Sequence, residues 1–469
     1  MALRRLRLAE RRKARGYTQE DLAGRLGCDR STVIRWEHAQ TDPQPWQRPA
    51  LARALQVTPG ELATLLQDVT QVPGRADRAS LITSVPLDFS LSSAYTVRVM
   101  EGFSARDIAS RRQALADITV ITGAVLLRPV RQWAASLALD PGQVASAGPD
   151  EVSELEQAVT TFRRWDASGA GGLRRKAVAG QLNAVAETLR DPHPAASARR
   201  LFGVTGELAQ LAGWMAYDAG LHGAAQQYYI IGLHACREAG NPGLGAKIIG
   251  DMTQLSTALG HYADSLSLVR AALSALPPQA GSLVRCELLG LEARASAHLG
   301  PSEAGNADRA AQHCVALFAE TAGHEPAPDW IHYMGQAETH CLAANVYIQL
   351  ALTSTASQHR RHYAQRAETH VQCARQARGG GYVRSRVLDE IRLARVRLAQ
   401  DEPAEAAAAG IRAIHLAAGT RSAVVLDWLT QFGHDLPARY PGGCEAASFD
   451  GELRDYLRQA APTRLGDLP

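Results

Sequence analysis

The sequence lacks the features that would place it in an oxidising compartment or in a membrane. Its 469 residues contain 7 cysteines and no Cys-x-x-Cys pair, which argues against a disulfide framework. No run of about 18 residues is free of charged and strongly polar side chains, so we expect no membrane-spanning helix and no membrane partner. Because the basic first residues precede no apolar stretch, we also expect no secretory signal and a cytoplasmic location.

Motifs of catalysis are missing as well. The sequence has no Gly-x-Ser-x-Gly elbow, no His-Glu-x-x-His pair, no dinucleotide-binding fingerprint and no phosphate loop. Its cysteines and histidines do not follow the spacing of zinc ligands. We therefore expect no enzymatic activity, no cofactor and no metal site. An enzyme whose site leaves no such motif is the less favoured alternative.

Lysine is scarce, and the basic charge that remains is unevenly distributed. Only Lys13, Lys176 and Lys247 are lysines among 50 basic residues, an arginine bias that is typical of GC-rich bacterial genomes. Residues 1–67 contain 12 basic and 7 acidic residues, a net charge of +5, whereas the rest of the chain has a net charge of −2. This asymmetry predicts an anionic partner for the first 67 residues alone.

Residues 17–37 have the pattern of two short helices joined at a glycine. Thr18 is a suitable cap for the first helix, and Gly27 is placed to end it. Asp29 can cap a second helix, which mixes arginine, serine and threonine with apolar residues. This arrangement predicts a helix-turn-helix, whose second helix can enter the major groove of DNA.

The sequence TQEDLA, the glycine turn and STVIRWE together resemble the Xre/Cro family of DNA-binding domains. The resemblance implies that the second helix reads bases and that Glu37 pairs within the fold. Arginine is suited to this reading because it can bond guanine O6 and N7 together. The predicted DNA-binding residues are Gln19, Arg30, Ser31, Thr32, Arg35, Arg11 and Arg12. Of these, Arg11 and Arg12 are assigned to phosphate contacts. A head that binds protein instead of DNA is the alternative.

Helical periodicity dominates the whole chain, so we predict an all-α fold. We divide it into a helix-turn-helix domain at 1–67, a linker at 68–104, a helical connecting region at 105–194 and a repeat domain at 195–469. The linker contains prolines, glycines and two β-rich pieces, which favour an extended chain. The connecting region is predicted to begin with one long helix over 105–127.

Glycines recur at a fixed interval in the repeat domain. Gly220, Gly260 and Gly300 are 40 residues apart, and each closes a helix rich in alanine and leucine. The pattern resembles the tetratricopeptide repeat, which implies an α-solenoid of helix pairs with a concave face for a peptide, small molecule or protein. The predicted ligand-binding residues are Gln210, Trp214, Tyr217, Gln254, Arg294 and His298. For each of them, the alternative is an ordinary solvent-exposed position on a scaffold, with no role in ligand binding.

Together these patterns predict a cytoplasmic bacterial transcription regulator that reads double-stranded DNA and senses a signal through its repeat body. One recognition helix reads few base pairs, so we expect a homodimer on a near-palindromic site. The alternative is a non-enzymatic interaction scaffold whose head does not read DNA.

Overall fold

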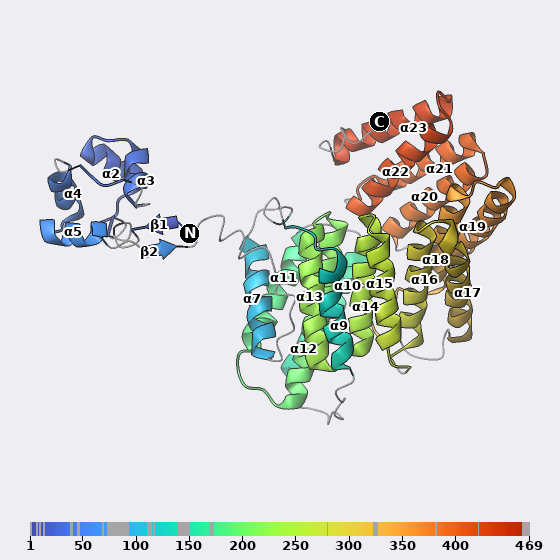
Figure 1. Ribbon diagram of the computed structural model, residues 1–469, viewed down its shortest axis with the longest axis horizontal. Coiled ribbons are helices and arrows are strands. Elements are labelled where there is room, and N and C mark those ends of the chain that lie inside the picture. The colour runs from blue at the N-terminus through green and yellow to red at the C-terminus, as the bar shows by residue number, and fades with distance from the viewer. Residues whose placement is uncertain are drawn as a thin grey trace. The chain divides into compact units, whose positions relative to one another are not determined.

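The chain forms two compact units, Met1–Ser84 and Val85–Pro469, which we call the head and the body. The computed structural model describes residues 2–5, 8, 11–12, 15–37, 41–44, 47–67, 70–72, 93–109, 115, 118–137, 150–167, 173–278, 280–321, 327–379, 382–420 and 422–461. Both units are built from helices, which confirms the predicted all-α class (Figure 1).

The described part of the head includes four short helices and a two-stranded ribbon, whose bounds follow. These are β1 (Ala2–Arg4), α2 (Gln19–Leu26), α3 (Arg30–Glu37), α4 (Arg48–Leu55), α5 (Pro59–Gln67) and β2 (Thr70–Val72). Their buried side chains, including Leu22, Val33, Trp36 and Leu55, form one small hydrophobic core. The head therefore has its own interior.

The first helix of the predicted motif is defined at both ends by its own residues. The Thr18 hydroxyl accepts a hydrogen bond from the Asp21 amide at 3.1 Å, and the Asp21 carboxylate accepts one from the Thr18 amide at 2.8 Å. This reciprocal capping box satisfies donors that the first turn leaves unpaired. At the other end Gly27 takes the left-handed conformation, with φ of 63°, which glycine adopts without steric cost. The predicted helix start and glycine turn are confirmed.

The predicted linker at 68–104 is wrong at both of its ends. Thr70–Val72 pairs antiparallel with Ala2–Arg4, so this segment belongs to the head. Its partner strand lies at the other end of the head sequence, and no hairpin turn signals such a pairing. Residues 73–92, which include one of the β-rich pieces, lie outside the described residues.

The second β-rich piece, residues 93–99, is helical. It falls in α7 (Ser93–Ala109), where Val97, Met100 and Phe103 are all buried. Their spacing of three residues lines one face of a helix, and burial of that face overrides the strand preference of the β-branched residues.

The predicted helix over 105–127 is also interrupted. Residues 119–122 are not helical, and a single 3-10 turn, η1 (Gly123–Val125), follows. The Ile121 amide and carbonyl bond the side chain of Gln226 at 2.7 and 2.9 Å, and the Gly123 amide donates to Asp264 at 2.7 Å. The backbone at this point is therefore paired with distant helices instead of with its own turn.

Three more helices complete the entrance to the body: α9 (Leu127–Ser136), α10 (Asp150–Ala167) and α11 (Leu173–Thr188). Helix α9 lies against α13 (His222–Ala239) and α15 (Tyr262–Ala275) of the repeats. Its Trp133 is fully buried where Gly245 has no side chain, since a Cβ there would stand 2.4 Å from the indole nitrogen. A glycine thus admits the largest side chain at this contact.

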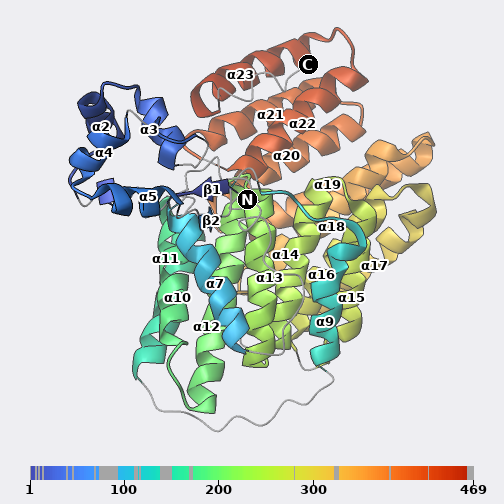
Figure 2. The same cartoon turned by 60° about the vertical axis from the view of Figure 1, so that its left-hand side comes forward.

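Six consecutive helix pairs follow. They are α12 (Ala195–Asp218) with α13 (His222–Ala239), α14 (Pro242–Ala258) with α15 (Tyr262–Ala275), α16 (Ser282–His298) with α17 (Ala304–Thr321), α18 (Gln336–Thr353) with α19 (Ser357–Ala377), α20 (Val383–Ala399) with α21 (Pro403–Ala417), and α22 (Ala423–Arg439) with α23 (Cys444–Ala460). The first helix of each pair contacts the first helix of the next. This succession is the packing of a helical repeat, and Figure 2 shows it from a second direction.

The periodic glycines mark the turns within pairs. Gly220, Gly260 and Gly300 have φ of 75°, 80° and 100°, values that L-residues with side chains rarely adopt. Each follows the first helix of its pair, as the repeat spacing predicted.

The last pair also contacts the first. Helix α22 lies against α12, and Arg384 at the start of α20 forms an ion pair with Asp218 at 3.0 Å. The Ser422 hydroxyl, which caps α22, donates a hydrogen bond to the same carboxylate. We call this contact the α12–α22 closure. Separately, no helix within the described ranges combines the length and the apolar character needed to cross a bilayer.

Candidate nucleic-acid interface and inner face of the repeat

Helix α3 has an apolar side in the core of the head and a polar side in solvent. Val33 and Trp36 are 1% and 2% exposed, which fixes the orientation of the helix. Arg30 and Arg35 are exposed, and Arg35 donates to the Thr32 hydroxyl at 3.5 Å. The side chain of Ser31 lies outside the described residues. Two guanidinium groups and a hydroxyl thus share the solvent face, a donor set suited to base edges and phosphates.

Gln19 and Arg12 converge on Glu37 inside the head. Arg12 donates to the Glu37 carboxylate at 2.6 Å and to the Tyr17 carbonyl at 2.6 Å, while Gln19 donates to Glu37 at 2.7 Å. Arg12 and Glu37 are each only 6% exposed. The predicted pairing of Glu37 within the fold is confirmed. The phosphate contact predicted for Arg12 is wrong, because its guanidinium is buried and already bonded; Gln19 is half-buried and engaged in the same network.

Arg11 also has a structural role. Its guanidinium donates to the carbonyls of Leu55 and Gln56 at 3.0 and 2.7 Å. These carbonyls end α4, where a cation balances the negative end of the helix dipole. The phosphate contact predicted for Arg11 is therefore not supported, since its donors bind the chain itself.

A further arginine is part of the same interior. Arg5, 6% exposed, donates to the Trp36 and Thr41 carbonyls at 2.9 and 3.1 Å and to the Asp42 carboxylate. Net charge alone does not separate such internal arginines from those at the surface. Part of the +5 charge of the first 67 residues therefore stabilises the head instead of facing an outside partner.

Two short helices joined at a glycine, with a buried apolar side and an exposed polar side on the second, define a helix-turn-helix. The family model described as a helix-turn-helix domain matches residues 5–65. The comparison with curated proteins gives no match to the chain.

The predicted ligand-binding residues all lie on the first helices of their pairs, but they do not form one open groove. Gln210 is 4% exposed, donates to Asp251 at 2.7 Å and accepts from Arg163 at 2.9 Å. Tyr217 is 7% exposed, and burial raises its pKa to about 12. The surface position predicted for these two residues is therefore wrong, because neighbouring helices cover them; Gln254 is half-buried.

Gln210 borders a buried ionic cluster that crosses three helices. Lys247 pairs with Asp251 one turn further along α14 and with Glu287 of α16 at 3.3 Å. Burial by itself would lower the pKa of Lys247, but the two carboxylates outweigh it and raise that pKa. Burial raises the pKa of Glu287, against the attraction of Lys247. One ammonium thus faces two carboxylates, and the buried Oε2 of Glu287 has no hydrogen-bond partner among the described residues, so acidic groups outnumber the basic one in this cluster.

The other predicted residues adjoin a group of arginines. The Arg294 guanidinium lies over the Trp428 ring at 5.8 Å from its centroid, and Trp214 is covered by Arg384 at 5.4 Å. His298 stacks on Tyr262 with ring centroids 4.4 Å apart. Burial, assisted by Arg294, lowers the pKa of His298 to about 3. The imidazole is therefore neutral at physiological pH.

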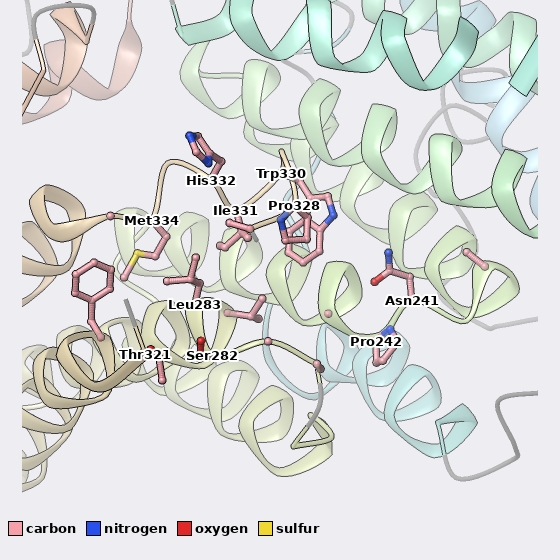
Figure 3. A pocket seen from close by; sticks show the side chains of 18 of the residues that line it. Asn241, Pro242, Ser282, Leu283, Thr321, Pro328, Trp330, Ile331, His332 and Met334 are labelled. Carbon is pink, nitrogen blue, oxygen red and sulfur yellow. The ribbon is translucent and has the colours of Figure 1, made fainter. Parts of the chain in front are cut away.

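Sequence reasoning missed a pocket at the ends of the repeats. This pocket of about 900 Å³ is lined by the starts of α14 and α16 and by the segment before α18 (Figure 3). Leu283, Ile331 and Met334 provide apolar walls, with Asn241 and Ser282 as polar groups. The closest sequence signal is the glycine at the start of each helix, which does not by itself identify a pocket. Within the described ranges, no group of three or more potential ligands is placed to hold a metal ion.

Proposed function

We propose that the protein is a non-enzymatic, sequence-specific transcription regulator that binds double-stranded DNA through α3 of the head. The observation that carries this proposal is the exposed pair Arg30 and Arg35 on a helix whose opposite side is anchored in the core. A helix held rigidly from behind can present side chains to the major groove with little loss of entropy. The Xre/Cro resemblance of residues 17–37 supports the same reading.

The test compares two exposed arginines of the head. Arg35→Ala should weaken binding to a site selected from random DNA by about 1–3 kcal/mol and weaken binding to random DNA much less. Arg53→Ala, on the exposed side of α4, is the matched control and should leave the preference for the selected site unchanged. Gel-shift titrations at one fixed salt concentration measure both DNAs, because affinity for DNA falls steeply with salt.

Equal losses on both DNAs would assign Arg35 to phosphate contact only. If the wild type shows no preference for any sequence, the head is not a sequence reader, and the interaction scaffold becomes the better proposal. The head would then bind a protein partner instead of DNA.

We further propose that the body resembles tetratricopeptide repeats in function as well as in packing, and that it senses a ligand and pairs two heads as a cytoplasmic bacterial homodimer. The support is the succession of helix pairs whose first helices share one face. Linked heads gain effective concentration on a two-part site. Sedimentation of the full chain, with and without a two-part DNA site, tests this proposal. A protein that is monomeric under both conditions would refute the paired arrangement.

A further inference from the structure

We call the face formed by the first helices of the pairs the inner face of the body. It contains three arginines that converge near one indole ring. Arg294 of α16 and Arg392 of α20 both lie over Trp428 of α22, at 5.8 and 5.2 Å from its centroid. Arg395 lies one turn from Arg392 on the same helix. We call Arg294, Arg392, Arg395 and Trp428 the arginine cluster.

Among the described residues, two carboxylates form ion pairs with the three guanidinium groups of the arginine cluster. Arg392 pairs with Asp389 at 2.8 Å, but Asp389 also pairs with Arg378 at 2.6 Å. Arg395 approaches Asp435 only to 3.7 Å, and its buried Nε has no hydrogen-bond partner among the described residues.

Arg294 is still less compensated. Among the described residues, no carboxylate lies at ion-pair distance from its guanidinium. Burial lowers the pKa of Arg294, and the charges of Arg392 and Arg395 lower it further. Like charges held together and partly removed from water raise the free energy of the empty site. An anion would relieve that cost.

The cluster is enclosed without being sealed. Protein surrounds Arg395 closely enough for burial to lower its pKa, yet 19% of its side chain is accessible. Arg384 and Asp218, which join α20 to α12 nearby, are 20% and 17% accessible. Because the α12–α22 closure lies beside this part of the inner face, a small molecule suits it better than a folded protein.

We propose that the arginine cluster binds a small organic anion, whose carboxylate or phosphate group is held by the forked donors of Arg294 and Arg395. Guanidinium groups bind both kinds of anion through paired hydrogen bonds, and these charge-assisted bonds are the strong ones. This inference rests on the sensing role proposed above for the body and specifies the chemistry of its ligand.

The test is calorimetric titration of the full-length protein with two probes, pyrophosphate and citrate, at constant ionic strength set with chloride. We expect saturable binding of at least one probe, and the stronger probe distinguishes a phosphate ligand from a carboxylate ligand. Arg294→Gln should weaken that binding about tenfold or more, the loss of one charge-assisted pairing. Arg294→Lys keeps the charge without the fork and should weaken it less.

Two controls locate the binding. Arg270→Gln removes an arginine of α15 that is half-exposed and paired with Glu292, and it should leave the affinity unchanged. The double variant Arg30→Ala, Arg35→Ala weakens any anion site on the head and should also leave it unchanged. Thermal melting of each variant verifies that it is folded.

Three results would overturn the proposal: no saturable binding of either probe, binding that survives Arg294→Gln in full, or binding that disappears only in the head variant. DNA selectivity is measured separately without any probe. A head that fails to select DNA would refute the proposed function while leaving anion binding by the body intact, and the reverse outcome would refute only this inference.

Discussion

Replacing Glu37 by alanine should destabilise the head without removing any DNA contact. The carboxylate accepts hydrogen bonds from Arg12 and Gln19 and is 6% exposed. Its loss leaves the Arg12 guanidinium buried beside a single remaining acceptor, the Tyr17 carbonyl. Breaking a buried ion pair from one side costs about 3–5 kcal/mol.

That cost is large for so small a unit. A unit spanning Met1–Ser84 is expected to have a free energy of unfolding of about 4–13 kcal/mol, at the usual stability per residue. Glu37→Ala would therefore remove a quarter or more of it. For a unit of this size the melting temperature should fall by about 12–40 °C.

Amide hydrogen exchange of the full-length protein measures the effect locally. We expect protection of peptides from α2 and α3 to fall by about two to four orders of magnitude, while peptides of the body keep theirs. Glu20→Ala, an exposed acid on α2, is the control and should stay within about 0.5 kcal/mol of the wild type. Unchanged protection in Glu37→Ala would refute the reasoning, because it would mean that the ion pair does not stabilise the head.

Three further outcomes test the body. Gly410→Ala should destabilise it by about 1–3 kcal/mol because the new Cβ would lie 2.7 Å from two phenylalanine rings, whereas Gly451→Ala, with open space around it, should be neutral or stabilising by up to about 1 kcal/mol in chemical denaturation. His298, whose folded pKa of about 3 lies below its unfolded value, takes up a proton more readily when unfolded, so stability should fall as pH drops from 6.5 toward 3, and His298→Gln should flatten that fall. Asp218→Asn should weaken the bonds to Ser422 and Arg384 and increase hydrogen exchange in α22 more than in α14; an equal increase in both helices would contradict the α12–α22 closure.

Local signals in the sequence predicted local structure well. The Thr18 cap and the Gly27 turn act through neighbours within three or four residues, so they could be recognised without the fold. The glycines at intervals of 40 residues likewise marked the turns of the first three pairs. In each case the residue type is the one that its own local backbone conformation favours.

Features that depend on distant partners could not be predicted. Arg12 reads as a surface charge until Glu37 is brought beside it, and strand Thr70–Val72 has no partner until Ala2–Arg4 reaches it. Tyr217 was assigned to an open groove because nothing in the sequence places α22 against α12. The arginine cluster joins residues of α16, α20 and α22, and no sequence pattern links these three helices.

The α12–α22 closure has a consequence for how the body loses its structure. In an open array of repeats each unit is held only by its neighbours, so the terminal units fray first and melting proceeds inward. Here Asp218 of the first pair is bonded to Ser422 at the start of the last pair and to Arg384 of the fifth. Neither end can fray without breaking the contact that also secures the other, so unfolding should be shared across the array, and removing the last pair would loosen the first.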